Sequence, residues 1–461
     1  MSLESIKSIF EDHKNYFSEG ETLSISFRKN QLARLRDLIE KNEKAIHDAL
    51  KEDLGKSEFE AYVSETGFCI LEIDKAIHNI DKWARTKSVS TSLLHFPASS
   101  YIKPEPLGTV LIISPWNYPF QLLISPLVGA IAAGNTAILK PSEVAPATSR
   151  IVADLIKNHF SNSYISVVEG AVEETQALLD LPFDYIFYTG NEFVGKIVME
   201  KASKHLTPVT LELGGKSPCF IVGDVDLDLT IKRITWGKFF NAGQTCVAPD
   251  YLLVEEKHYE KIVPLFEKYI NELYGKDPKI SDDYGKIINQ RHFDRLMGYF
   301  TKEEILLGGD SDREAKYISP TILKAQFDSS VMREEIFGPL CPLIKIKNID
   351  EGIKFVNSRP KPLALYIFTN NEELETKILE RTSSGGVCIN DTLLHLSSDT
   401  LPFGGVGASG MGMYHGKFSF DTFSHFRAVM KRRQMLDIPI KYPPYTSSKL
   451  SKIRKLLKFM G

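Results

Sequence analysis

A cysteine and a glutamate stand in two short motifs whose residue types can do chemistry on a carbonyl group. Cys246 ends the segment Asn-Ala-Gly-Gln-Thr-Cys, and Glu212 is the second residue of Leu-Glu-Leu-Gly-Gly-Lys. A thiolate adds readily to a carbonyl carbon, and a carboxylate can take a proton from water as a general base. Gly243 lets the backbone approach closely, which leaves a neighbouring N–H free for a developing oxyanion. A single cysteine is more often a small buried hydrophobe, so the other motifs must support this reading.

Three glycine-rich stretches could each hold a phosphate, and their contexts separate them. Residues 214–217 imitate the end of a P-loop, but Thr210 stands where that loop requires its first glycine. Residues 405–410 fit the pattern GxGxxG without an evident strand before them, which favours a mobile or close-packed loop. Only residues 189–195 follow a predicted strand and open a helix, the context in which backbone N–H groups meet a pyrophosphate.

The elements that must position these motifs follow from the periodicity of apolar residues. Residues from about 5 to 85 show helical spacing, whereas 88–106 are rich in Ser, Thr, Pro and aromatic residues and predict an extended arm or hairpin. Short apolar strands then alternate with helices to about residue 213, and a second alternating region runs from 217 to 390. This alternation predicts an α/β fold with a doubly wound, Rossmann-like parallel sheet. The first region has predicted strands at 108–113, 136–139, 164–168, 185–188 and 209–213, and predicted helices after Pro119, at about 147–160 and after Gly190.

Composition excludes several classes of protein. With 43% hydrophobic and 25% charged residues, the 461-residue chain can bury two or more cores. A formal net charge of -3 gives no reason to expect a nucleic-acid partner.

The cysteines and histidines indicate a reducing compartment and no metal. The five cysteines are an odd number without CxxC spacing, and the eleven histidines show no HxxxH or HxH spacing. The first residues lack the apolar core of a signal peptide, and the chain has no run of about 18 apolar residues. We therefore expect a cytoplasmic protein that does not span a membrane.

Seven motifs in order make the chain resemble the NAD(P)-dependent aldehyde dehydrogenases, most closely their class 3 branch. The resemblance covers nearly the whole chain. The class 3 likeness rests on the short N-terminal region, on Asn191 after Gly190, and on residues 418–427. The seven motifs lie at residues 114–120, 139–143, 188–195, 211–218, 243–246, 334–339 and 402–412.

The resemblance implies a division of the chain and a homodimer. The NAD(P)-binding domain would comprise 1–83 and 104–207, the catalytic domain 208–395, the oligomerisation arm 84–103 and 417–440, the active-site and cofactor loop 396–416, and a basic amphipathic tail 441–461.

The resemblance also implies a role for each motif residue. Cys246 would attack the aldehyde, Asn117 and the Cys246 backbone N–H would hold the oxyanion, and Glu212 would activate the water that hydrolyses the thioester. Of the cofactor residues, Lys140 and Glu143 would hold the adenosine ribose, and Glu335 would hold the nicotinamide ribose with Phe337 packed beside it. The predicted cofactor residues are Ser114, Trp116, Lys140, Glu143, Gly190, Gly195, Glu335 and Phe337. NAD is the expected cofactor, with NADP tolerated.

A mostly apolar pocket is expected to bind the aldehyde. It would comprise Tyr118, Leu122, Leu393 and His395, without an Arg or Lys that could clamp a carboxylate or phosphate. The expected substrate is a neutral, lipophilic aldehyde, either medium to long in chain or aromatic. The alternatives are a semialdehyde dehydrogenase or a coenzyme A-acylating enzyme of the same superfamily, and a non-catalytic binding protein on this fold. Retention of Glu212, Asn117 and Cys246 argues against the last two.

The last thirteen residues predict a basic amphipathic helix. Leu450, Ile453, Leu456, Leu457 and Met460 recur at helical spacing, and Lys or Arg residues occupy most of the other positions. Two readings stay open for this segment. It either packs against its own subunit or the dimer partner, or it attaches reversibly to the anionic inner surface of a membrane.

Overall fold

The computed structural model describes residues 2–92, 95–398, 400–434, 437 and 439–460, without the side chains of 459 and 460. Residue 1, which begins the predicted first domain, and residue 461, which ends the predicted tail, lie outside the described residues. The side chain of Met460, one of the predicted apolar positions, lies outside them as well. The chain divides into two compact units. One comprises Met1–Trp83 with Pro106–His425, and the other comprises Ala84–Glu105 with Phe426–Gly461.

The larger unit contains a six-stranded sheet that confirms the predicted parallel alternation. Its order is β17-β7-β6-β3-β4-β5, and only β17 runs antiparallel to its neighbour. The register places Ile113 beside Lys140 and Tyr188, and Thr189 beside Glu212. Because the parallel strands therefore end at one edge, the residues at their carboxyl ends lie close together. The strands are β3 (Thr109–Ile113), β4 (Thr136–Lys140), β5 (Ile165–Val167), β6 (Tyr185–Thr189), β7 (Val209–Glu212) and β17 (Gly410–Met411).

Helices cover this first sheet and bury its apolar strands. Ile6 and Phe10 of the first helix pack in one core cluster with Leu111, Ile138 and Ile186 of the sheet. Every residue of α6 (Gln121–Ala133) is buried, because other helices and the sheet surround it. The remaining helices of this part are α1 (Leu3–Glu19), η1 (Glu21–Leu23), α2 (Ile25–Lys41), α3 (Glu43–Leu54), α4 (Glu58–Ala61), η2 (Tyr62–Thr66), α5 (Gly67–Trp83), α7 (Pro146–His159), α8 (Val172–Leu179), α9 (Glu192–Ser203) and α15 (Lys417–Thr422).

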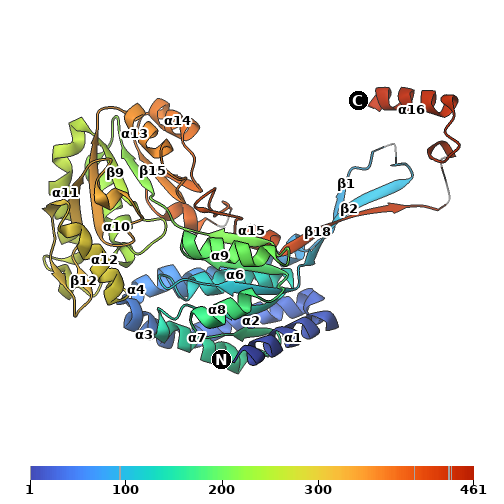
Figure 1. The fold of residues 1–461 in the computed structure, drawn as a ribbon, viewed down its shortest axis with the longest axis horizontal. Coiled ribbons are helices and arrows are strands. Elements are labelled where there is room, and N and C mark those ends of the chain that lie inside the picture. Colours follow the sequence, from blue (N-terminus) through green and yellow to red (C-terminus); the bar gives the residue numbers. More distant parts are fainter. Residues whose placement is uncertain (1, 93–94, 399, 435–436, 438, 461) are drawn as a thin grey trace. The chain divides into compact units, whose positions relative to one another are not determined.

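A seven-stranded sheet forms the second half of the larger unit. Its order is β10-β13-β14-β9-β8-β15-β16, and only β10 is antiparallel. In Figure 1, β9 and β15 lie among α10, α11, α13 and α14. Its strands are β8 (Pro218–Ile221), β9 (Tyr251–Glu255), β10 (Glu304–Leu307), β13 (Thr321–Ala325), β14 (Leu340–Ile346), β15 (Ala364–Phe368) and β16 (Gly386–Ile389), with the small pair β11 (Ser311–Asp312) and β12 (Tyr317–Ile318) beside them in sequence. Its helices are α10 (Leu227–Phe239), η4 (Phe240–Gly243), α11 (Glu256–Tyr274), η5 (Pro278–Ile280), α12 (Gln290–Phe300), η6 (Ser330–Met332), α13 (Ile349–Asn357), α14 (Glu372–Arg381) and η7 (Leu394–Ser397).

Three details differ from the sequence-based expectation. The predicted catalytic domain begins at residue 208, but β7 pairs with β6 and so belongs to the first sheet. The predicted arm resumes at 417, but residues 417–422 form α15, which packs on α6 because Gly129 lets Ser419 approach closely. Helix α8 was missed, since it has 8 residues and only Leu178 and Leu179 of them are buried.

The GxGxxG stretch at 405–410 is a close-packed loop, one of the two readings that the sequence allowed. A Cβ at Gly405 would lie 2.0 Å from the Ser409 carbonyl oxygen, and one at Gly410 would lie 1.9 Å from that of Leu211. These glycines permit backbone packing against the strand that carries Glu212.

The smaller unit contains a three-stranded sheet and a terminal helix. The sheet has the order β1-β2-β18, formed by β1 (Lys87–Val89), β2 (Ala98–Pro106) and β18 (Ser424–Arg432), which confirms the predicted extended arm. After η8 (Pro439–Lys441), the chain ends in α16 (Ser447–Met460). Within the described residues, no helix is both long and apolar enough to cross a bilayer.

Candidate active site

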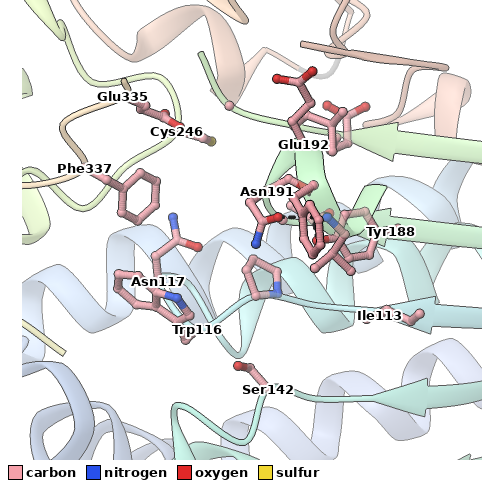
Figure 2. A pocket seen from close by; sticks show the side chains of 18 of the residues that line it. Ile113, Trp116, Asn117, Ser142, Tyr188, Asn191, Glu192, Cys246, Glu335 and Phe337 are labelled. Atoms are coloured by element: carbon pink, nitrogen blue, oxygen red, sulfur yellow. Dashed lines mark hydrogen bonds between the residues drawn. The ribbon is translucent and has the colours of Figure 1, made fainter. Parts of the chain in front are cut away.

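A cavity of about 1170 Å³ lies between the carboxyl edge of the first sheet and loops of the second. Asn117, Glu212 and Cys246 all line it. Figure 2 shows Cys246 next to Glu335, with Phe337, Asn117 and Trp116 nearby. We call the strand-end side, with Ser114, Lys140, Thr189 and Glu212, the first wall. The second wall comprises the loops at 240–246 and 331–337.

The loop that carries Cys246 has an unusual backbone. Asn241, Ala242 and Gly243 have φ values of 52°, 51° and 74°, in the left-handed region that favours glycine. A Cβ at Gly243 would lie 2.3 Å from the Gly338 carbonyl oxygen. Gly243 is therefore required both for its conformation and for its close contact with Gly338, which directly follows the loop at 331–337.

The Cys246 thiol is protonated at neutral pH in this state. Burial raises its pKa to about 12, and the nearby carboxyl groups of Glu335 and Glu212 add to the effect. The backbone N–H groups of Cys246 and Val247 act in the opposite direction by stabilising the thiolate. The sulfur is a nucleophile only once its proton has been removed, so a proton acceptor must act in the same cavity.

Hydrogen bonds join Asn117 to the loop that carries Cys246. The Asn117 side-chain amide donates to the Gln244 carbonyl over 3.1 Å. Asn241 donates from its own amide to the carbonyls of Asn117, at 2.9 Å, and Gln244, at 3.2 Å. Asn117 is buried, and its amide lies in the cavity wall with Cys246. The lining of the cavity thus contains both a neutral amide donor and the thiol.

Glu212 ends β7 as a buried carboxyl group. Neither of its carboxyl oxygens has a hydrogen-bond partner among the described residues. Burial therefore raises its pKa well above the usual range. A water molecule or substrate that enters the cavity would supply the missing partner.

The first wall offers further polar groups to a ligand. The Ser114 and Thr189 hydroxyls are buried and have no partner within the described structure. The Lys140 ammonium is buried, donates to the Pro141 carbonyl and lies 3.7 Å from the half-exposed Glu143 carboxylate. Burial lowers the pKa of Lys140, and Glu143 partly offsets the change.

The N-terminus of α9 completes the first wall. Gly190 lines the cavity, and a Cβ there would lie 2.2 Å from the Tyr188 hydroxyl. Asn191 caps the helix by accepting from the Val194 N–H. This end of α9 presents the positive end of the helix dipole toward the cavity.

Three cations hold the second wall by its backbone. The buried Lys216 donates to the carbonyls of Val331 and Glu334 and pairs with Asp250. Arg295 donates to the Glu335 and Ile336 carbonyls, and Arg359 donates to that of Met332. The Asp250 carboxylate also accepts from the Ile336 N–H at 3.0 Å.

These contacts orient Glu335 and Phe337. Phe337 has a φ of 50°, and its ring centroid lies 5.2 Å from that of Trp116. The Glu335 carboxyl group lies against Gly214, where a Cβ would be 2.2 Å from it. Burial and the charge of Asp250 raise the pKa of Glu335 to about 8.

The structure brings most of the predicted site residues together. Ser114, Trp116, Asn117, Leu122, Lys140, Glu143, Gly190, Glu212, Cys246, Glu335 and Phe337 all line the one cavity. Gly195 does not line it among the described residues, and instead lets α9 pack closely on Leu213.

Three predicted pocket residues lie behind the cavity lining rather than in it, within the described structure. Tyr118 is buried and shares a 2.6 Å hydrogen bond with Thr245. Leu393 is buried with a φ of 62°. His395 packs between Tyr366 and Phe403, and burial lowers its pKa to about 4.

Sequence reasoning missed several lining residues. Phe403 and Tyr414 line the cavity with Leu122; both lie in the predicted active-site and cofactor loop at 396–416, but neither was singled out as a site residue. Val172 and Phe193 also line it, and their apolar side chains are 64% and 74% exposed. The described part of the chain has no group of three or more His, Cys, Asp or Glu side chains that could hold a metal ion.

Comparisons with known sequences identify the family of this chain. The model of the aldehyde dehydrogenase family matches residues 1–429. The chain is 49% identical over 443 residues to 4,4'-diaponeurosporen-aldehyde dehydrogenase of Staphylococcus aureus. This match covers 95% of this chain and 96% of that protein. It is 48% identical to aldehyde dehydrogenase family 3 member B3 of Mus musculus, over 96% of this chain and 93% of that protein. The predicted likeness to class 3 is confirmed.

Solved structures give the same result. The substrate-bound state of Staphylococcus aureus AldH matches with a TM-score of 0.96 and 48% identity, over 98% of this chain and 99% of that one. The NAD+ complex of an aldehyde dehydrogenase from Bacillus cereus matches with a TM-score of 0.85 and 26% identity, over 94% of this chain and 89% of that one. With a family model over residues 1–429 and near-complete relatives at this identity, the chain belongs to the aldehyde dehydrogenase family.

Proposed function

We propose that this aldehyde dehydrogenase oxidises a neutral, lipophilic aldehyde to its carboxylic acid through a thioester on Cys246. The observation that carries the proposal is the placement of Asn117, Glu212 and Cys246 around one cavity with the residues suited to a dinucleotide. Leu122, Phe403 and Tyr414 offer apolar surface in the cavity that also holds Cys246 and Glu212, which supports a lipophilic aldehyde as substrate. A panel of aldehydes that differ in chain length and charge tests the substrate class. Preference for a carboxylate-bearing semialdehyde would contradict it.

The first wall and the loop at 331–337 of the second wall fit a dinucleotide. Buried hydroxyls of Ser114 and Thr189 lack partners in the described structure, and exposed Val172 and Phe193 offer apolar surface for an adenine ring. Lys140 and Glu143 would hold the adenosine ribose, and Glu335 would accept from the second ribose with Phe337 beside it. NAD is the main cofactor in this proposal, with NADP as a tolerated alternative. Among similar structures, the Bacillus cereus enzyme is an NAD+ complex and a Methanocaldococcus jannaschii enzyme with 26% identity is an NADP complex.

The chain's own groups carry the covalent steps. The Cys246 thiol first loses its proton to a carboxylate of the cavity, Glu335 or Glu212, both of which lie near it. The sulfur then adds to the aldehyde carbon, and the carbonyl oxygen takes the negative charge. The Asn117 amide and the Cys246 N–H donate to that oxygen. When bound, the nicotinamide supplies the hydride acceptor for the oxidation. Glu212, once ionised, takes a proton from the water that attacks the thioester carbon, and the acid leaves as Cys246 is released.

Rapid-quench mass spectrometry tests this order of steps. In Glu212→Gln, hydrolysis slows while the thiol still reacts, so a mass equal to the acyl group should accumulate on Cys246. The wild-type protein should carry less of this adduct at the same time point. If no adduct forms under any condition and Cys246→Ala stays active, the covalent mechanism is wrong.

The smaller unit is proposed to form an intersubunit sheet in a homodimer. β1 and β18 are the outer strands of its three-stranded sheet, and their residues are mostly exposed. Edge strands with unpaired backbone groups can pair with another chain. Analytical ultracentrifugation at micromolar concentration should give the mass of a dimer, and a monomer would contradict the proposal.

For the protein in the cytoplasm, α16 is proposed as a reversible contact with the inner membrane surface. Leu450, Leu456 and Leu457 are 51%, 42% and 51% exposed, and the helix holds five Lys or Arg residues without an acidic one. Apolar burial and attraction to anionic lipid would act together.

Liposome co-sedimentation at low salt compares the full chain with a version that ends at Ser448. The full chain should bind vesicles containing phosphatidylserine more strongly than vesicles of phosphatidylcholine, and the shortened chain should bind neither. Equal binding by the two chains would leave α16 with a structural role only.

A further inference from the structure

Lys56 is a buried cation directly behind Asn117. It lies between α3 and α4, and its side chain is 0% exposed. Its ammonium donates to the Asn117 carbonyl over 3.0 Å and lies 3.9 Å from the centroid of the Tyr118 ring. Its third neighbour is the Glu65 carboxylate at 2.5 Å. The hydrogen bonds of this ammonium are thus directed at Glu65 and at the segment that presents Asn117.

Glu65 holds the other end of the same segment. It lies in the π-helical turn η2, and its side chain is also 0% exposed. Its second carboxylate oxygen accepts from the backbone N–H groups of Phe120, at 3.1 Å, and Gln121, at 2.8 Å. These are N–H groups at the start of α6, which have no partner within the helix itself. Lys56 and Glu65 therefore hold residues 117–121 at both ends, Lys56 through the Asn117 carbonyl and Glu65 through the N–H groups of Phe120 and Gln121.

Two further contacts connect residues 117–121 to the loop that carries Cys246. The Asn117 carbonyl that accepts from Lys56 also accepts from the Asn241 amide, which reaches Gln244 as well. The Tyr118 hydroxyl bonds to Thr245, the residue before Cys246. A shift of residues 117–118 would therefore move the Asn117 amide relative to the Cys246 sulfur.

We propose that Lys56 and Glu65 are positioning residues that hold the Asn117 amide at the oxyanion site. The proposal rests on the proposed role of Asn117 in the preceding section. A buried ion pair is seldom more stabilising than apolar side chains of the same volume, so stability alone does not account for this pair. Its hydrogen bonds instead define the geometry of a donor whose effect on rate depends on placement within a fraction of an ångström.

A double-mutant cycle tests the proposal. Lys56→Met should lower kcat by about 10- to 100-fold while changing KM for NAD little, since the carbonyl of Asn117 loses its charged donor. Asn117→Ala should lower kcat by about 100- to 1,000-fold. Because Lys56 acts through Asn117, the double variant should be no slower than Asn117→Ala alone. Lys56→Arg, which keeps a buried cation and donor, should recover part of the loss.

Arg28→Met is the matched control. Arg28 is another buried cation, and it donates to the backbone carbonyls of Thr22, Leu23 and Ala132, none of which lines the cavity among the described residues. Its loss should lower the melting temperature and leave the kcat of folded protein unchanged. If Lys56→Met yields no folded protein, Glu65→Gln takes its place in the same cycle, because it removes the charge pair and keeps an oxygen for the α6 N–H groups.

The outcomes separate this proposal from the one on which it rests. An Asn117→Ala variant with wild-type kcat would show that the proposed role of Asn117 is wrong. If Asn117→Ala is slow and the Lys56 or Glu65 substitution slows it further by the same factor as in wild type, the pair does not act through Asn117. A loss of kcat in Arg28→Met equal to that in Lys56→Met would likewise overturn the positioning role.

Discussion

The two walls of the cavity are built from different kinds of backbone. The first wall consists of residues at the ends of regular parallel strands, whose register alone brings Lys140, Thr189 and Glu212 to one edge. The second wall consists of loops with left-handed residues at Asn241, Ala242 and Phe337. Side chains from distant elements hold those loops by their carbonyls. Lys216, Arg295 and Arg359 hold the loop at 331–337 in this way.

The difference shows how a polar group at a strand end and a thiol on a loop are each held in position. A polar group at a strand end needs only the sheet beneath it, since the strands on both sides determine its place. A nucleophile on a strained loop needs many contacts, because each left-handed residue costs free energy that the surroundings must offset. Substitutions in the second wall should therefore affect both folding and rate. At the first wall, substitutions of the residues proposed to hold the dinucleotide should affect ligand preference, whereas substitution of Glu212, the proposed general base, should affect rate.

The largest effect is expected at the centre of the second wall. Cys246→Ala should lower aldehyde oxidation on the order of 10,000-fold or more, because no other group replaces the nucleophile. Cys341→Ala is the control, since this thiol is buried in β14 and does not line the cavity among the described residues. Reduction of the dinucleotide followed at 340 nm measures both variants. Equal activity of Cys246→Ala and Cys341→Ala would remove the catalytic distinction between them.

Gly243→Ala should test the strain of the same loop. Its φ of 74° and the 2.3 Å approach to the Gly338 oxygen predict a loss of about 3 kcal/mol in the free energy of unfolding. Gly298→Ala is the matched control in α12, where no atom lies within 4 Å of the added Cβ, and it should stabilise by about 0.5–1 kcal/mol. Denaturation by urea measures both. A Gly243→Ala protein as stable as wild type would show that the loop relaxes freely.

The pH dependence of stability should reveal Glu335. Its folded pKa of about 8 lies above its ordinary value of 4.5. Below pH 4.5 both states hold the proton, and between pH 4.5 and 8 only the folded state does, so stability falls as pH rises through this window. One such proton gives a slope of about 1.4 kcal/mol per pH unit. In Glu335→Gln, the fall between pH 5 and 8 should be shallower by up to that amount, whereas the exposed Glu334→Gln should keep the wild-type slope. An unchanged slope in Glu335→Gln would contradict the raised pKa.

The smallest effect is expected at the first wall. Glu143→Ser should raise kcat/KM for NADP relative to NAD by about 10-fold, since it removes a charge that would repel a 2'-phosphate. Glu173→Ser removes a carboxylate of α8 that does not line the cavity within the described structure, and it should leave the ratio unchanged. If the two variants give the same ratio, Glu143 does not discriminate between the cofactors.

The sequence predicted the parts of the fold that depend on local patterns. Apolar runs placed the five parallel strands of the first sheet to within a residue or two, because short buried strands alternate with helices there, whereas the two-residue strand β17 was not predicted. Helix α8 was not predicted because it is short, with 8 residues, and buries only Leu178 and Leu179. The resemblance placed the start of the catalytic domain at 208, before β7, whereas the alternation of strands and helices had put this strand in the first region, where the structure has it.

The candidate site likewise has residues that the sequence predicted and residues whose placement only the structure showed. Its motifs made Cys246, Glu212, Asn117 and the cofactor residues predictions from the sequence alone, because the residue types and their order are distinctive. The placement of Tyr118 and His395 behind the lining, and of Phe403 and Tyr414 in it, depends on side-chain directions that no local pattern encodes.

The sequence by itself determined the kind of chemistry, since a thiol, a carboxylate and an amide in recognisable motifs define it. Only the tertiary structure decided what supports these groups. Lys56 lies 61 residues before Asn117, and Asn241 lies 124 residues after it, yet both donate to the same carbonyl. Contacts between residues so distant in the chain arise only when the sheets and helices pack, and burial in that packing also changes the pKa values of Glu212, Glu335 and Cys246.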